Sequence, residues 1–93
     1  MHVLRIEHPV PDYDSWKAIF DDDPIGRERS GVRRYRIMRV TDDPNHVMID
    51  LVEFDSASEA EDVHAALRNL WGRVDVTRDP QARIVEAVEI KEY

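Results

Sequence analysis

Residues 32–41 (VRRYRIMRVT) and 46–54 (HVMIDLVEF) are two β-rich runs separated only by Asp-Asp-Pro-Asn, and they constrain the fold more than any other part of the chain. A polar loop this short joins strands that are antiparallel neighbours. With that loop, the strand register pairs Arg34 with Glu53. A shift of one residue in the register would move every side chain to the opposite face of the sheet. The register therefore does not decide which face carries Arg34 and Arg36.

A strand and a helix precede this hairpin. Residues 2–8 alternate with a period of two, which is typical of a strand. After two prolines, apolar side chains recur at helical spacing from Tyr13 to Phe20, and Asp12 stands where an N-cap oxygen would accept from the free amides. We therefore expect a helix to begin directly after Asp12.

Three consecutive aspartates, Asp21–Asp23, close that helix at its negative end, where carboxylates are disfavoured. Asp-Pro is a good helix start, so we expect a break before Pro24 and a second short helical piece that ends at Gly31. The alternative is a cation site, but an EF-hand loop here would need ligands from residues 25 and 32, which are isoleucine and valine. The sequence favours capping, and we expect no metal.

A second helix and a last strand follow the hairpin. Ser56 and Glu59 form a capping box, and Gly72 is the expected stop. The residues from 82 to 93 alternate apolar and polar side chains and predict a strand. The apolar stripe of the helix comprises Ala60, Val63, His64, Leu67, Leu70 and Trp71.

The predicted order is strand, helix, strand, strand, helix, strand within a single domain of residues 1–93. With right-handed crossovers, this order gives an α+β, ferredoxin-like fold, in which both helices cover one face of a four-stranded antiparallel sheet. The other face would expose apolar side chains with embedded charges, and such a surface marks an interface or a binding site. A 93-residue chain also has a small core, so we expect a homodimer through that face.

The composition limits the partners. The formal charge of -7 argues against a nucleic-acid partner, which requires a basic surface. No apolar stretch is long enough to cross a membrane, and no signal peptide stands at the amino terminus, so we expect a cytoplasmic location. The absence of cysteine excludes thiolate chemistry and zinc-thiolate sites.

Three segments resemble the small dimeric α+β barrel proteins related to the antibiotic biosynthesis monooxygenases. They are His8–Asp21 (HPVPDYDSWKAIFD), Arg27–Val47 with its Asp-Asp-Pro-Asn loop, and Glu53–Ala60 (EFDSASEA). The resemblance covers the first two thirds of the chain and is closest to an uncharacterised branch. It implies a homodimer whose sheets pack face to face, with a pocket between sheet and helices for a small aromatic or polyketide-like molecule, and cofactor-independent oxygenase chemistry. In the haem-degrading branch of that family, a tryptophan precedes the histidine of the second helix. Here Trp71 follows His64, so that arrangement is absent.

Five side chains are candidates for the site. His8 and His64 are the candidate proton carriers, because histidine is the side chain that titrates near neutral pH. Tyr35, Arg36 and Trp71 are candidates for placing the substrate, Arg36 through an anionic group. Four of them have an ordinary alternative: the histidines as satisfied core residues, the tryptophan as an apolar anchor, and the arginine as a solvated or cross-strand paired charge.

Two functions therefore stay open. The first is a dimeric protein that binds a small molecule, either as a binding protein or as a cofactor-free oxygenase. The second is a structural or regulatory dimer whose interior is filled by side chains. A cavity of about 300 Å³ or more with convergent polar groups would favour the first, and a solid interior the second.

Overall fold

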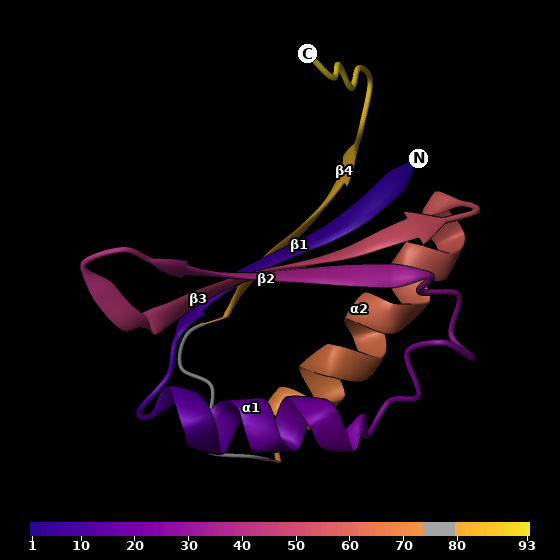
Figure 1. Ribbon diagram of the computed structural model, residues 1–93. Helices are drawn as coiled ribbons and strands as arrows, with labels where there is room; N and C mark the ends of the chain where they lie inside the picture. Colours follow the sequence, from indigo (N-terminus) through magenta and orange to yellow (C-terminus); the bar gives the residue numbers. More distant parts are fainter. Residues whose placement is uncertain (74–79) are drawn as a thin grey trace.

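The computed structural model describes residues 1–73 and 80–93 and shows one sheet with two helices on one side of it (Figure 1). The sheet order is β2-β3-β1-β4, and all three neighbouring pairs are antiparallel. This is the predicted ferredoxin-like arrangement. The elements are β1 His2–Pro9, α1 Tyr13–Asp22, β2 Arg34–Val40, β3 Asp43–Phe54, α2 Ala57–Trp71 and β4 Gln81–Glu86.

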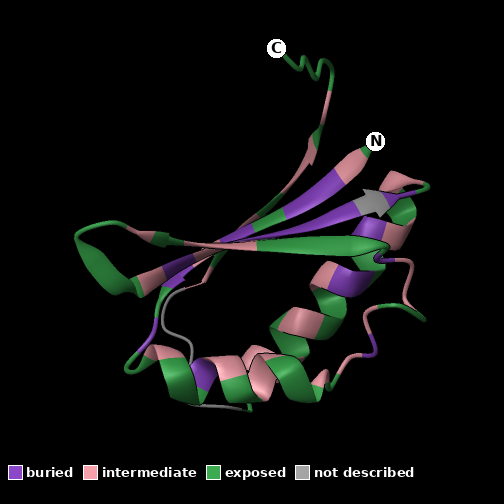
Figure 2. Cartoon of the chain, in the orientation of Figure 1, coloured by how far each residue is buried: buried purple, intermediate pink, exposed green. Residues whose placement is uncertain are grey.

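The core lies between the sheet and the helices. Leu4 and Ile6 of β1 face Leu51 and Ile49 of β3, and all four side chains are buried. Trp16 is the buried residue of α1 and packs in the same cluster. Figure 2 shows the exposed residues on β2, on the outer sides of both helices and at the carboxyl end.

The predicted hairpin is present, but its register is wrong by one residue. Arg34 pairs with Val52, not with Glu53, and Arg36 pairs with Asp50. The cause is a tighter turn than expected: β3 begins at Asp43, and an irregularity next to Val40 absorbs the extra residues of the loop. Arg34 and Arg36 consequently lie on the face away from the helices.

Helix α1 begins and ends as its aspartates predict. The Asp12 carboxylate accepts from the Ser15 amide at 2.9 Å, which is an N-cap bond. Asp23 is the C-cap in a left-handed conformation with φ of 52°, and its carboxylate accepts from the Arg27 amide at 2.9 Å. Thus Asp23 joins the end of the helix to the turn that follows.

The predicted second helical piece after Pro24 does not form. The chain makes successive turns there, since Gly26 and Gly31 have φ of 66° and 101°, outside the helical region. Gly31 closes the segment, as expected, but closes a turn and not a helix.

Helix α2 follows its capping box. The Ser56 hydroxyl accepts from the Glu59 amide at 3.3 Å, while the Glu59 carboxylate accepts from the Asp55 amide at 3.1 Å. Gly72 is the C-cap, as predicted.

The last strand is shorter than predicted. It ends at Glu86, and the Ala87 amide makes a final bond to the Met1 carbonyl at 2.9 Å. Beyond that point the chain leaves the sheet. Val88 and Ile90, which were expected in the strand, are therefore exposed.

Candidate functional site

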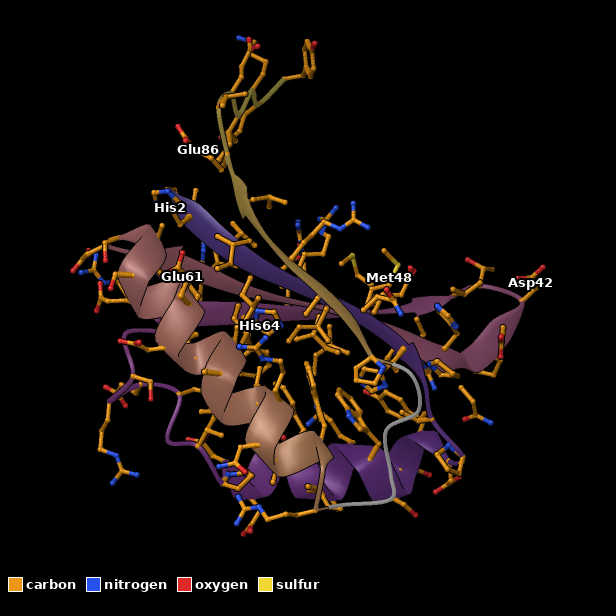
Figure 3. All side chains as sticks on the ribbon, turned by 180° about the vertical axis from the view of Figure 1, so that it is seen from behind. His2, Asp42, Met48, Glu61, His64 and Glu86 are labelled. Atoms are coloured by element: carbon orange, nitrogen blue, oxygen red, sulfur yellow. The ribbon has the colours of Figure 1, made fainter. Side chains whose placement is uncertain are left out.

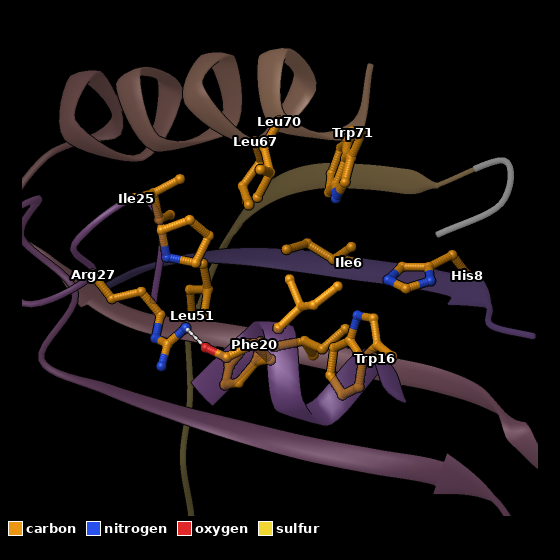
Figure 4. A pocket seen from close by; sticks show the side chains of 13 residues that line it. Ile6, His8, Trp16, Phe20, Ile25, Arg27, Leu51, Leu67, Leu70 and Trp71 are labelled. Carbon is orange, nitrogen blue, oxygen red and sulfur yellow. Dashed lines mark hydrogen bonds between the residues drawn. The ribbon is translucent and has the colours of Figure 1, made fainter. Parts of the chain in front are cut away.

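A cavity of about 60 Å³ lies between α1, the carboxyl-terminal half of α2 and the sheet, and it is partly open to solvent (Figure 4). Apolar side chains from all three elements line most of it. His8 and Arg27 are the ionisable groups of the lining. The complete lining is Ile6, His8, Trp16, Ile19, Phe20, Pro24, Ile25, Arg27, Ile49, Leu51, Leu67, Leu70 and Trp71.

His8 stands near the end of β1 and is 2% exposed. Its Nδ1 lies 3.0 Å from the carbonyl oxygen of Pro9, and because a carbonyl can only accept, Nδ1 carries a proton. Burial lowers the pKa of His8, an effect that the Pro9 contact only partly opposes, so the ring is neutral at pH 7. A neutral ring with its proton on Nδ1 has a lone pair on Nε2 and can accept a proton there.

The ring of His8 is oriented by Trp16. The two rings make an edge contact with centroids 5.9 Å apart, and Trp16 in turn packs against Phe20 at 5.2 Å. The imidazole is therefore held by one backbone bond and one aromatic wall. Such a fixed ring suits a group that must present one nitrogen to a ligand.

Arg27 supplies a cation to the lining. Its Nη1 donates to the Phe20 carbonyl at 2.8 Å, the dashed contact in Figure 4, and its guanidinium stacks 3.9 Å from the centroid of the Phe20 ring. An ion pair with Asp23 at 3.4 Å completes its environment. Our sequence reasoning missed Arg27, because nothing in its spacing separates it from the other arginines; only the turn fixed by Asp23 carries it to the cavity.

The five predicted site residues do not come together. His8 and Trp71 both line the cavity. His64 lies on the side of α2 that faces the sheet (Figure 3) and makes an edge contact with Trp71 at 6.4 Å, but it does not line the cavity. Burial, then the nearby Arg68, lowers the pKa of His64.

Tyr35 and Arg36 point to opposite sides of β2. Tyr35 makes an edge contact with Phe20 at 5.0 Å, on the helix side, yet it is outside the lining of the cavity. Arg36 lies on the other side and binds Asp50. Both border an open hollow on the sheet face away from the helices, and His8 does not.

Asp50 is, besides His8, a buried ionisable residue in the part of the chain that the structure describes, and it was not among our candidates. It is 1% exposed and accepts from Arg5 twice, at 2.8 and 2.9 Å, and from Arg36. The Arg5 hydrogen bond, helped by Arg36, lowers the pKa of the Asp50 carboxyl despite its burial. A carboxylate in the middle of the apolar run Met48–Val52 was the signal that could have identified it.

The part of the chain that the structure describes offers neither a metal site nor a membrane-spanning helix. Among residues 1–73 and 80–93, no three His, Cys, Asp or Glu side chains are grouped so that they could hold a metal ion. His46 lies 3.4 Å from Glu7, which is an isolated pair. In the described part of the chain, no helix combines the length and the apolar character that a membrane span requires.

Comparison with known proteins shows the fold and leaves the family unassigned. No protein-family model matches the chain, and no curated protein matches its sequence. Among solved structures, it is similar to protein Atu4242 from Agrobacterium tumefaciens, a structural genomics target, with a TM-score of 0.64 over 92% of each chain. The two sequences are 13% identical, so this similarity concerns the fold and not the chemistry.

Proposed function

We propose that the chain is one subunit of a homodimer that binds a compact, largely apolar organic molecule in the cavity between the sheet and the helices. The observation that carries the proposal is the lining itself: an apolar and aromatic wall with one neutral, buried histidine and one cation. Ligand sites are typically apolar pockets in which a few polar groups set the orientation.

The volume restricts the ligand. Pockets for drug-sized molecules span about 300 to 1,000 Å³, well above the 60 Å³ of this cavity. A single ring, or a chain of similar size seated partly in the open mouth, is compatible with that volume. The polycyclic substrates that the family resemblance suggests are too large for the cavity.

The polar groups define the chemistry that the ligand should offer. Nε2 of His8 can accept a proton from a hydroxyl or from an acidic carbon of the ligand, and the positive Arg27 would stabilise the resulting anion. Proton transfer is therefore the enzymatic step that these residues support best. Reaction of that anion with dioxygen, the oxygenase step, rests on the resemblance alone.

Dimerisation is supported by the sheet face that the helices leave uncovered. Met38, Met48 and Val85 are half-buried on that face, beside Val3 and Val52, which are 9% and 8% exposed in the single chain. Apolar side chains of this kind favour a second layer. Sedimentation at micromolar concentration is expected to show a dimer, and a monomer would contradict the assembly.

The small volume also favours a second function, a structural or regulatory dimer with a filled interior. The two are separated by binding measurements with intrinsic fluorescence, because the only two tryptophans of the chain, Trp16 and Trp71, both line the cavity. We expect phenol or catechol at millimolar concentration to shift the tryptophan emission saturably.

The variants His8→Gln and Arg27→Gln should weaken that response, while Arg29→Gln, on the exposed part of the same turn, should leave it unchanged. The same panel is then screened for turnover, where His8→Gln should abolish any activity and His64→Gln should not. If no compound changes the tryptophan emission, the structural or regulatory dimer with a filled interior is the better description.

A further inference from the structure

The sheet face opposite the helices, here called the open face, carries a line of charges across all four strands. Arg36 of β2 faces Asp50 of β3, Asp50 faces Arg5 of β1, and Arg5 faces Arg83 of β4. The Asp50 carboxylate is already paired with Arg5 and Arg36. Two arginines directly opposite each other repel, so the Arg5–Arg83 pair favours an additional anion.

The next line of the open face is apolar on three strands. Val52, Val3 and Val85 are neighbours there, with Arg34 at the end on β2. An open hollow of about 540 Å³ lies over the two lines. Of the described side chains in these strands, Glu7 and Asp50 are the acids on this face, against four arginines. The open face is thus basic in a chain whose formal charge is -7.

The C-terminal segment, residues 87–93 (AVEIKEY), has the complementary character. Val88 is 87% exposed and Ile90 is 69% exposed, although both are large apolar residues. Glu89 and Glu92 outnumber the single Lys91. Figure 1 shows this segment running on past the end of the sheet, beyond the amino terminus of β1.

We infer that the C-terminal segment of one copy lies across the open face of a second copy, with its apolar side chains on the valine line and its glutamates near Arg5 and Arg83. Three observations converge on this occupant. The segment is acidic and the open face basic, Val88 and Ile90 stay mostly exposed on their own chain, and the segment leaves its own sheet after Ala87.

This inference rests on the homodimer of the proposed function, and it adds the segment that crosses between the subunits. Exchange in both directions places each segment on the other subunit, as a two-fold dimer requires. Ile90 borders the hollow on the open face of its own chain. The C-terminal segment therefore begins its path to the second copy at the edge of the proposed interface. An interface between two copies would therefore bury the arginines together with acids that neutralise them.

The test uses a spin label, because the chain has no cysteine to interfere with labelling. Unenriched protein labelled at Lys91→Cys is exchanged into dimers with ¹⁵N-enriched wild-type protein. We expect broadening of the amide signals of Val3, Arg5 and Val52 in the enriched copy. A matched label at Ala65→Cys, on the exposed side of α2, should leave those signals sharp.

The dimer dissociation constant, measured by sedimentation, gives a second readout. The full-length double variant Val88→Ser with Ile90→Ser should raise it at least tenfold, and Arg83→Glu should also raise it. The controls, Ala65→Ser with Ala66→Ser and Arg29→Glu, should change it less than twofold. A dimer without broadening of the open-face signals would overturn the inference and leave the proposed assembly intact, whereas a monomeric wild type would overturn both.

Discussion

At the scale of single residues, Trp16 and His8 show how one aromatic contact serves both packing and the site. Trp16 is the buried anchor of α1, and its ring lies against Tyr13, Phe20 and His8. A side chain with that many ring contacts fixes the helix on the sheet and the imidazole in the cavity together. Changes at Trp16 should therefore affect stability and ligand response at once.

The variant Trp16→Ala should reduce the free energy of unfolding by about 3 to 5 kcal/mol, because truncation leaves a large cavity in the core. Trp16→Phe keeps most of the apolar volume and should cost less. Urea denaturation followed by circular dichroism measures both. An unchanged midpoint for Trp16→Ala would mean that the side chain is not part of the core.

The pH dependence of stability should report on His8. Its pKa in the folded protein is lowered by burial, whereas in the unfolded chain it is near its ordinary value of 6.5. The folded state therefore binds fewer protons, so the contribution of His8 is complete above pH 6.5 and falls as the pH drops below that value. His8→Gln should lose less stability than wild type between about pH 7 and pH 5. Parallel curves for the two proteins would contradict a buried neutral imidazole.

At the scale of elements, the Asp50 cluster ties three strands together. Its two arginines come from β1 and β2, and Asp50 itself lies in the middle of β3. The chain offers a matched exposed pair, Arg33 with Asp55, in which both side chains are mostly in water. Surface pairs of that kind contribute little to stability.

We expect Asp50→Asn to destabilise the protein by about 2 to 3 kcal/mol, because two arginines lose their counter-charge on the open face. Asp55→Asn should cost less than about 0.5 kcal/mol. Thermal unfolding of the two variants at equal protein concentration compares them. Equal losses would show that burial of Asp50 adds nothing.

The connection between α1 and β2 depends on Gly31. It adopts φ of 101°, and a Cβ built there would lie 2.7 Å from a carboxylate oxygen of Glu59. Gly31→Ala should cost about 1 to 3 kcal/mol, since alanine disfavours that backbone conformation and also crowds the start of α2. Gly72→Ala, at an ordinary helical φ of -73°, is the control and should be nearly neutral.

At the scale of the whole molecule, the sheet is covered by helices on one face only (Figure 1). The helices cover one face of the sheet, and the open face retains valines, methionines and arginines. This asymmetry is the common basis of the proposed dimer and of the crossing C-terminal segment. It also separates the two functional surfaces, because the cavity with His8 lies on the helix side.

We expect the purified protein to carry neither a metal nor haem. Asp12 and Asp23 serve as helix caps and Asp21 and Asp50 as ion-pair partners, and the described residues contain no group of three or more His, Cys, Asp or Glu side chains that could hold a metal. Elemental analysis should find no stoichiometric metal, and titration with haem should produce no saturating Soret band. A stoichiometric metal would contradict this expectation.

The sequence alone determined the order of elements, the caps and the layer arrangement. These depend on local chemistry: an aspartate before the first helix, a serine and a glutamate before the second, and side-chain periods of two or of 3.6. Asp12 and Ser56 act as the patterns predicted. Such signals can be recognised in the sequence because each involves residues only a few positions apart.

Only the tertiary structure decided the faces and the site. A register one residue away from the expected one pairs Arg36 with Asp50 and places it away from His8, and sequence patterns do not specify the register when both faces of a strand are mixed. Arg27 reaches the cavity through a turn, and the last strand ends at Glu86, after which the chain leaves the sheet. These outcomes depend on contacts between residues distant in the chain, which is why spacing along the sequence could not predict them.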